Sequence, residues 1–319
     1  MAKSGRNGFL QRRVKWPLEA AAFYCCLTFV RLLPLDWASA LGGFLGRTLG
    51  PRLSVAGRAV ANLKLVYPDI TEAEIRRITR GMWENLGRVF GEFPHLAEIV
   101  APESGRVEMV DAEYALRIKG SETGGIIVSG HIANWEILSV ALALVFDGAS
   151  TSVMREPKNP LVRGMLDRLR NIAGGRRIAK GPSGAKQIVA ALRAGGPVGM
   201  LCDQKLNNGV AVPFFGIEAM TAPTPAQLAL RLGCPVIPAR LERLGGARFK
   251  LTCYPPLDLP DSGDREADVL ALTTRINGLL EDWIRDRPQD WFWLHRRWPK
   301  EAYAARGFGP VMSNGHQGA

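Results

Sequence analysis

The sequence lacks the residue patterns on which metal-dependent enzymes and serine-nucleophile enzymes rely. Its 319 residues include only four histidines and five cysteines. None of them has metal-ligand spacing, so we expect no metal and no cofactor. The odd number of scattered cysteines, without a C-x-x-C pair, suits a reducing compartment. No G-x-S-x-G motif occurs and no cysteine stands beside a histidine, so nothing in the sequence predicts a covalent enzyme intermediate.

Acidic residues are also scarce. There are 30 Asp and Glu against 41 Lys and Arg, which gives a net charge of +11. This balance favours an anionic partner, such as nucleic acid, a phospholipid surface or an acidic protein. The chain has no nucleic-acid recognition motif and no basic patch interleaved with aromatic residues, so we expect no nucleic-acid partner. A hydrophobic content of 47% and a charged content of 22% are ordinary for a folded globular protein.

No apolar run reaches the roughly twenty residues that span a bilayer. The best candidate is the stretch of about sixteen residues from Leu18 to Leu33, which contains Glu19 and Arg31 and follows five basic residues. We interpret it as a membrane-anchoring helix with a cytoplasmic basic flank, either spanning the membrane or lying in its interface. Two alternatives stay open. One is a signal peptide cleaved at the "ASA" of residues 38–40, and the other is an ordinary buried helix.

The rest of the chain alternates strand and helix patterns. The "TEAE" of residues 71–74 is a capping box that predicts a long amphipathic helix. After Pro102, short apolar segments predict strands, and helical patterns separate them: "GIIVSG", "TSVM", "PVGMLCD", "CPVIPARLER" and "RFKLTCY". We therefore expect an α/β fold with a mixed, partly parallel sheet flanked by helices. The expected division is a helical membrane-facing part at 1–100, a catalytic body at 101–305 and a disordered tail at 306–319.

A histidine and a glutamate follow the first buried strand. His131 lies on the predicted strand-to-helix turn, and Glu136 lies about one turn into the helix. An imidazole can take a proton near neutral pH, and a carboxylate on its other nitrogen stabilises the imidazolium. Open α/β sheets bind ligands at this end of their strands. Taken alone, such a pair is in most proteins only a hydrogen-bonded turn histidine and a glutamate that favours the helix dipole.

Further polar residues follow the next strands. Arg155 and Asn159 come after "TSVM", and Arg170 lies on the helix that follows them. Asp203 and Gln204 end another strand, and "VPFFG" supplies an apolar wall beyond them. Polar groups at successive strand ends meet along one rim of a sheet, so these residues predict a single site.

The order of these motifs resembles a known family. H-x-x-x-x-E after a strand, R-x-P-x-N-P-L, D-Q before V-P-F-F-G, "MTAPT" and W-L-H-R-R-W appear in sequence, with "RAVANLKLVYP" upstream. Together they resemble the bacterial late acyltransferases of lipid A biosynthesis over about residues 15–300. The resemblance implies the lysophospholipid acyltransferase fold at the cytoplasmic face of the inner membrane. The implied reaction is transfer of an acyl group from an acyl carrier protein or acyl-coenzyme A to a membrane lipid.

The resemblance also implies roles for single residues. It makes His131 the general base and Glu136 its partner, and it places Arg170 and Asp203 among the functional residues. We also expect substrate-binding roles for a further set of residues. This set comprises Asn62, Asn134, Arg155, Asn159, Gln204, Arg296 and Arg297, the last two as candidates to bind phosphate groups of the acceptor.

Several points stay open at this stage. Between Arg155 and Arg193 there are ten Lys or Arg and two acids, which predicts either a docking surface for an acidic carrier protein or simply a solvated face. The acceptor can be a lipid A precursor, a glycerophospholipid or a mannoside, and the donor either thioester. A protein of another class, a non-catalytic membrane-surface protein, would explain the anchor but not the polar cluster.

Overall fold

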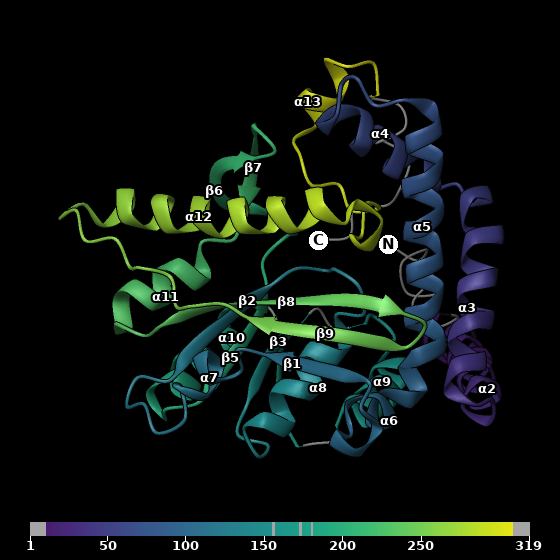
Figure 1. Cartoon of the computed structure of the whole chain (residues 1–319), viewed down its shortest axis with the longest axis horizontal. Coiled ribbons are helices and arrows are strands. Elements are labelled where there is room, and N and C mark those ends of the chain that lie inside the picture. The colour runs from purple at the N-terminus through teal and green to yellow at the C-terminus, as the bar shows by residue number, and fades with distance from the viewer. Residues whose placement is uncertain (1–10, 155–156, 172–173, 180, 309–319) are drawn as a thin grey trace, which may run out of the picture.

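The computed structural model describes residues 11–154, 157–171, 174–179 and 181–308. It begins with a helical part beside the sheet (Figure 1). A turn of π-helix at Gln11–Lys15 runs into α2, and α3 to α6 follow. Their bounds are Trp16–Leu32 for α2, Leu35–Leu49 for α3, Ala56–Val66 for α4, Glu72–Glu92 for α5 and Leu96–Val100 for α6. Short 3₁₀ turns lie at Gly50–Arg52, Phe93–His95 and Pro102–Ser104.

The capping box predicted at residues 71–74 is confirmed. The Thr71 hydroxyl accepts a hydrogen bond from the Glu74 N–H at 3.2 Å, and the Glu74 carboxylate accepts one from the Thr71 N–H at 3.0 Å. These bonds satisfy two backbone donors that have no partner inside the helix. Helix α5 therefore begins where the sequence predicts, and it forms the wall between the sheet and the first two long helices (Figure 1).

Helix α3 packs on α5 through glycines. A Cβ atom added at Gly42 would lie 2.3 Å from the Gly87 carbonyl oxygen, and one at Gly46 would lie 2.1 Å from the Trp83 carbonyl oxygen. Such a close approach of two backbones excludes any side chain at these positions. The inner face of α3 is therefore built from small residues, and its large apolar side chains are left for the opposite face.

Seven strands form the central sheet in the order β1-β9-β8-β2-β5-β3-β4. All neighbouring strands are parallel except β8 and β9. The expected mixed, partly parallel sheet is thus confirmed and is mostly parallel. The strand bounds are β1 Val107–Val110, β2 Gly125–Ser129, β3 Thr151–Met154, β4 Arg176–Ala179, β5 Pro197–Leu201, β8 Val236–Gly245 and β9 Arg248–Cys253.

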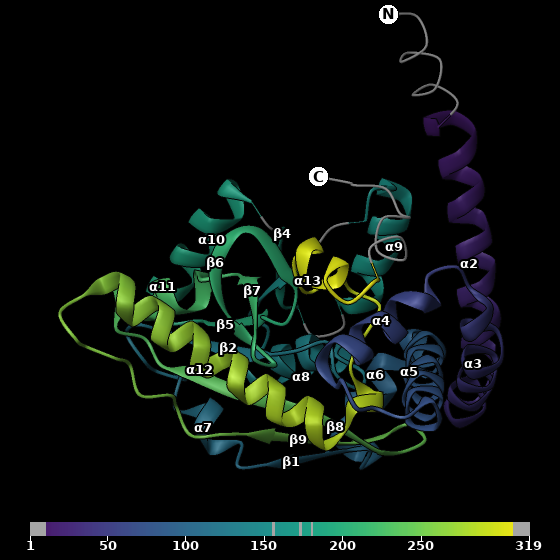
Figure 2. The ribbon, with the colours of Figure 1, turned by 90° about the horizontal axis from the view of Figure 1, so that it is seen from above.

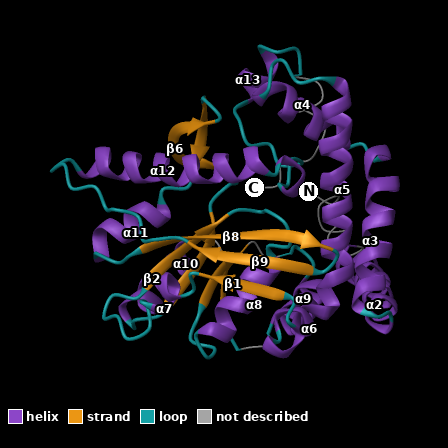
Figure 3. Ribbon diagram, viewed as in Figure 1, coloured by secondary structure: helices purple, strands orange, loops and turns teal. Residues whose placement is uncertain are grey.

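Helices cover both faces of this sheet. In the view of Figure 1, α8 and α9 lie below it, α12 lies above it, and α11 lies at its left end. The remaining bounds are α7 Glu113–Leu116, α8 Glu136–Val145, α9 Pro160–Arg170, α10 Pro182–Arg193, α11 Thr224–Leu232, α12 Arg265–Asp286 and α13 Lys300–Ala304. An antiparallel hairpin of β6 (Lys205–Phe214) and β7 (Ile217–Thr221) stands outside the sheet, beside α12. Figure 3 shows the strands in orange between the two helical layers.

Other expectations have mixed outcomes. Strands β2, β3, β5, β8 and β9 lie where the sequence predicts them, whereas β1, β4 and the hairpin were not predicted. Within the described ranges, none of the helices combines the length and the apolar composition needed to cross a membrane. The division of the chain at residue 100 stays a prediction. Of the expected tail, residues 309–319 lie outside the part that the structure describes.

Candidate active site

The candidate site lies where two neighbouring parallel strands end. His131 follows β2, and Asp203 and Gln204 follow β5. These strands pair in register from Gly125 with Pro197 to Ser129 with Leu201, so their carboxyl ends lie side by side. The topology alone therefore brings together residues that are 72 positions apart in the chain.

His131 is held by Asp203. The Nδ1 atom of His131 lies 2.7 Å from Asp203 Oδ1, and the backbone N–H of His131 donates to Asp203 Oδ2 at 2.9 Å. The Trp291 indole N–H donates to the same oxygen at 2.7 Å. Burial of Asp203 favours the neutral carboxyl, but attraction to the protonated form of His131 and these three hydrogen bonds outweigh it and hold the pKa of Asp203 well below its usual range. The ionised carboxylate accepts only, so Nδ1 carries a proton and neutral His131 keeps a lone pair on Nε2.

Gln204 faces that lone pair. Its Nε2 atom lies 3.2 Å from His131 Nε2, the atom that a substrate hydroxyl would approach. With Nε2 unprotonated, the amide N–H is the donor of this contact. Of the predicted substrate-binding residues, Gln204 is the one that the structure brings to the imidazole.

The prediction that Glu136 is the partner of His131 is wrong. Its carboxylate accepts two hydrogen bonds from Arg170, Nε to Oε2 at 2.7 Å and Nη2 to Oε1 at 2.6 Å. Both side chains are 12% exposed, and the Arg170 guanidinium lies over the Phe93 ring. Glu136 is the first residue of α8. Its carboxylate thus orients an arginine at the edge of the site, while the carboxylate behind the imidazole comes from the end of β5.

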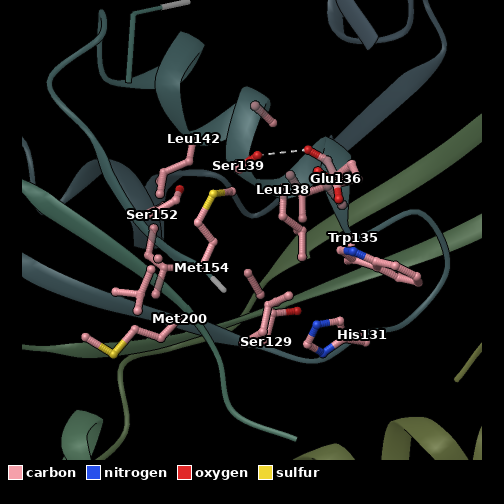
Figure 4. A pocket seen from close by; sticks show the side chains of 18 of the residues that line it. Ser129, His131, Trp135, Glu136, Leu138, Ser139, Leu142, Ser152, Met154 and Met200 are labelled. Atoms are coloured by element: carbon pink, nitrogen blue, oxygen red, sulfur yellow. Dashed lines mark hydrogen bonds between the residues drawn. The ribbon is translucent and has the colours of Figure 1, made fainter. Parts of the chain in front are cut away.

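An apolar cavity of about 420 Å³ opens onto these groups. Its polar end is formed by His131, Glu136, Arg170, Gln204 and His295. From there it extends between α8 and the sheet, as Figure 4 shows for part of its wall. The other lining residues are mostly apolar and include Ile127, Leu138, Leu142, Val145, Phe146, Met154, Met200, Leu251 and Cys253. A pocket of this shape suits a ligand with a polar reacting group and a long apolar chain.

Three predicted asparagines do not line this cavity. Asn62 is fully buried, donates to the carbonyl oxygens of Trp293 and His295, and accepts from Tyr303. Asn159 caps α9 by accepting from the Leu161 N–H at 3.0 Å, and it donates to the Trp16 carbonyl of α2 at 2.9 Å. The third, Asn134, is fully buried behind the catalytic turn. All three support the backbone around the site.

The predicted arginines near the C-terminus also lie outside the cavity. Arg297 is fully buried and donates to the Met220 carbonyl at 3.1 Å and the Thr221 hydroxyl at 2.6 Å. Its burial lowers the pKa of Arg297 to about 10. Arg296 is partly buried, and its Nε and Nη2 have no hydrogen-bond partner within the described residues. Arg155 lies outside the described residues.

Sequence reasoning missed two residues of the site. His295 lines the cavity and accepts from the Lys205 N–H through Nε2 at 2.9 Å. Trp291 supplies the indole bond to Asp203 and forms a bridge to Ile132. Both lie within the stretch "WFWLHRRW", whose local pattern carries no signal for a contact with strand ends far away in the chain.

Taken together, a mostly parallel α/β sheet, a His–Asp pair with a buried carboxylate at its carboxyl edge and an apolar cavity suit an enzyme site for a ligand with a long apolar part. Comparison with known proteins specifies the family. The model of the bacterial lipid A biosynthesis acyltransferases matches residues 11–300. The chain belongs to this family, and it is therefore an enzyme that transfers acyl groups.

Curated relatives agree with this family. The lipid A biosynthesis myristoyltransferase of Escherichia coli (strain K12) is 27% identical over 261 residues, which cover 80% of this chain and 77% of that protein. The lauroyltransferase of the same organism is 24% identical over 255 residues, 74% of this chain and 76% of that protein. Lipid A biosynthesis acyltransferase 1 of Shigella flexneri is 27% identical over 261 residues, with coverage of 80% and 77%.

Proposed function

We propose that this enzyme transfers a fatty acyl chain from an acyl thioester to a hydroxyl group of a lipid A precursor, with His131 as general base. One observation carries the proposal. The imidazole presents Nε2 at the polar end of an apolar cavity, while Nδ1 lies 2.7 Å from the Asp203 carboxylate. The names of the relatives, which specify myristoyl and lauroyl transfer in lipid A biosynthesis, support the class of chain and acceptor.

The reaction needs one proton acceptor and no covalent intermediate. His131 Nε2 takes the proton of the acceptor hydroxyl as its oxygen attacks the thioester carbonyl. A tetrahedral oxyanion forms, and the carbon–sulfur bond then breaks. The imidazolium returns its proton to the departing thiolate, so the products are an ester and a thiol. Asp203 stabilises the imidazolium between these two steps and is not itself protonated.

Arg170 is the candidate to stabilise the oxyanion. Glu136 binds it through one N–H on Nε and one on Nη2. A guanidinium has five N–H donors, so three stay available beyond this pair. Arg170 lines the same cavity as His131, and a fixed donor at the reacting carbonyl lowers the barrier most when it needs no reorganisation. The Glu136–Arg170 pair therefore has a role separate from that of the base.

The length of the acyl chain would be limited by the cavity wall at Gly199. A Cβ atom added there would lie 3.1 Å from Leu142 Cδ2, the flexible end of a side chain that also lines the cavity. The Gly199→Val variant should therefore fold and shorten the cavity. We expect kcat/KM to fall more for donors with longer acyl chains. If two methylene groups no longer fit in the cavity, the loss is about 10-fold, since burial of each contributes roughly 0.8 kcal/mol.

A series of acyl donors of increasing chain length would measure this effect. Gly278→Val on α12 is the matched control, because a Cβ atom at Gly278 meets nothing within 4 Å. An equal loss of rate for all chain lengths in Gly199→Val would contradict a limiting role for this wall.

We further propose that the outer face of α2 and α3 docks on the inner membrane from its cytoplasmic side. Large apolar side chains there are exposed: Leu18, Tyr24, Phe29, Leu32, Trp37, Phe44, Leu45 and Leu49. Both helices lie at the edge of the molecule, and Asn159 joins α2 to the loop before α9 (Figure 2). An apolar face of this size on a basic protein fits an anionic lipid surface.

Replacing two residues of this face tests the docking. Leu32 is 79% exposed and Trp37 is 72% exposed, so Leu32→Ser with Trp37→Ser should leave the melting temperature unchanged. Binding to anionic vesicles should weaken at least about 10-fold, because burial of one large apolar side chain contributes roughly 1.5–3 kcal/mol. Leu270→Ser on α12 is the control for loss of an exposed leucine. Vesicle binding that stays at the wild-type level would refute this membrane face.

The donor is proposed to be an acyl carrier protein. Arg168, Arg176, Lys186 and Arg193 are exposed within the basic stretch that follows β3, and attraction to an acidic carrier protein would steer its approach. The deciding experiment is transfer by the purified enzyme to a lipid A precursor, with acyl carrier protein and coenzyme A thioesters compared at increasing salt. Mass spectrometry of the product identifies acceptor and chain. Transfer only to a glycerophospholipid or a mannoside would overturn the proposed acceptor.

A further inference from the structure

A buried polar network lies directly behind the catalytic turn. The Glu92 carboxylate, at the end of α5, is fully buried. It accepts hydrogen bonds from the Ser39 hydroxyl at 2.7 Å and from the Asn134 amide at 2.8 Å. Arg243 of β8 donates to it through both Nη atoms, with Nη2 at 3.0 Å. Glu92 therefore joins α3, α5, β8 and the turn that carries His131.

The same network holds the backbone next to Asn134. Arg243 Nε donates to the Asn85 amide oxygen at 3.0 Å, and the Asn85 amide nitrogen donates to the Ala133 carbonyl at 3.0 Å. The Ala133 N–H donates to the Asp290 carbonyl at 2.9 Å. The backbone of this turn is thus bound on both sides before any substrate enters.

Such support is needed because the turn is strained. Ala133 has a φ of +51°, in the left-handed region that residues with a Cβ rarely adopt. A residue in such a conformation costs about 1–3 kcal/mol and persists only where the surrounding structure determines it. Two residues before it stands His131, and three residues after it stands Glu136. The path of the chain through Ala133 therefore sets where both functional side chains lie.

Stability alone does not account for a buried ion pair at this position. Well-packed apolar side chains can replace a buried ion pair without loss of stability, and often with a gain. An apolar pair cannot accept a hydrogen bond from Asn134, however. The Glu92–Arg243 pair fixes the position of a hydrogen-bond acceptor for the Asn134 amide, because the guanidinium holds the carboxylate in one place. The position of this turn matters because it carries His131, and a misplacement of about 1 Å at a reacting group can lower the rate about 10²-fold.

We propose that Asn134 and Glu92 are positioning residues of the acyl-transfer site, and that their hydrogen bond fixes the turn that carries His131. Asn134 then acts through the backbone, not by binding substrate. Ser39 extends the same support to α3. The kinetic part of the test rests on the function proposed above, and a structural measurement complements it.

The first variant removes the acceptor and keeps the packing. Glu92→Leu with Arg243→Met should fold, with a lower melting temperature because Ser39, Asn85 and Asn134 each lose a hydrogen-bond partner. We expect kcat to fall at least about 10-fold because the turn that carries His131 is no longer held in position. KM for the acyl donor should not change, because neither residue lines the cavity. An unchanged kcat in the folded double variant would overturn the proposal.

The second test exchanges the two partners and remains informative if the first variant does not fold. Asn134→Asp alone places two carboxylates face to face and should lower kcat. Adding Glu92→Gln restores a donor towards the new carboxylate at position 134, but its amide nitrogen replaces the oxygen that accepts from Arg243 Nη2, so kcat should recover only in part. Asn277→Ala is the control, because Asn277 is an equally buried asparagine that bonds Pro213 and Thr221 away from the turn. If Asn277→Ala lowers kcat as much at equal loss of stability, or if the exchange gives no recovery, the proposal fails.

Hydrogen exchange of the peptide containing residues 130–136 gives a readout without substrate. The N–H groups of His131 and Ala133 are both bonded to groups outside this turn, so their exchange should accelerate in Asn134→Asp and slow again in the exchanged pair. Unchanged exchange would overturn the positioning role. Altered exchange in a protein whose wild type transfers no acyl group would instead leave positioning intact and refute the proposed reaction.

Discussion

Replacing His131 with alanine should lower kcat by at least about 10²-fold, the low end of the loss expected when a general base is removed. The reason is geometric. No other described side chain presents an unprotonated nitrogen to the cavity in a position fixed by a buried carboxylate. The His295 Nε2 lone pair accepts from a backbone N–H, that of Lys205 at 2.9 Å, which cannot turn away, whereas the donor at His131 Nε2 is the side chain of Gln204, which an acceptor hydroxyl can displace. The rate should be measured with saturating donor and acceptor, so that the loss appears in kcat.

Stability and rescue separate this effect from misfolding. Loss of the imidazole takes a hydrogen-bond partner from the buried Asp203 carboxylate, so the melting temperature should fall, and the rate is compared at a temperature at which the variant is folded. Free imidazole can enter the space that alanine leaves, and it should restore part of the rate. A folded His131→Ala enzyme with a rate near that of the wild type would refute the assignment of the base.

Much of the fold could be predicted because its strands are apolar and bounded by turn residues. Gly125–Ser129 is buried at every position, which is typical of a central parallel strand. The two edge strands, β1 and β4, were missed because they lack this continuous apolar pattern. Arg176–Ala179 begins with two arginines, and Val107–Val110 has exposed residues at its centre. A strand with one neighbour can tolerate charged side chains, so its sequence shows no continuous apolar run.

The site could be predicted in its residues but not in its pairs. The candidate site contains four residues that the sequence analysis named: His131, Glu136, Arg170 and Asp203. That analysis paired His131 with Glu136, the nearer carboxylate along the chain, whereas the structure pairs it with Asp203. Local spacing cannot show that β2 and β5 are neighbours in the sheet, which decides that Asp203 faces the imidazole. Long-range pairing of this kind depends on strand order, and one sequence carries no direct signal for it.

Buried polar residues were the other source of error. Asn62, Asn134 and Arg297 stand in or near the motifs that resemble the family, and polar residues in motifs suggest contact with substrate. The structure buries all three and uses their hydrogen bonds within the protein. A buried polar side chain must find partners, and here those partners are segments that lie far apart in the chain. Motif residues can therefore serve to place a site as well as to contact its ligand.

The second large effect is expected for Asp203→Asn, with a loss in kcat of about 10²- to 10⁴-fold. The substitution keeps the volume and can still accept from the Trp291 indole and from the His131 N–H. Its amide N–H, however, can face His131 Nδ1 and donate to it. The imidazole would then carry its proton on Nε2, and the lone pair needed to accept the proton of the acceptor hydroxyl would be lost. The stabilising negative charge behind the imidazolium would be lost as well.

The pH dependence of the melting temperature tests independently whether the Asp203 carboxylate is ionised in the folded protein. The pKa of Asp203 is held well below its usual range in the folded protein, so its ionised form stabilises the fold above the unfolded value of about 3.9. This contribution is lost as the pH falls below that value towards the folded pKa. The melting temperature of Asp203→Asn should therefore lie below that of the wild type at neutral pH, and the difference should shrink in acid.

Two matched variants locate the effect on kcat. Trp291→Phe removes one hydrogen bond from Asp203 but leaves its charge and its contact with the imidazole, so its loss should be much smaller than that of Asp203→Asn. Glu136→Gln weakens the hold on Arg170 and should leave the tautomer of His131 unchanged. Nitrogen-15 chemical shifts of the imidazole report the tautomer directly. If the proton stays on Nδ1 in Asp203→Asn and the rate is near that of the wild type, Asp203 is not the group that sets the tautomer of His131. With the proton on Nε2 and a large loss of kcat, the residue that follows β5 is the one that makes His131 a base.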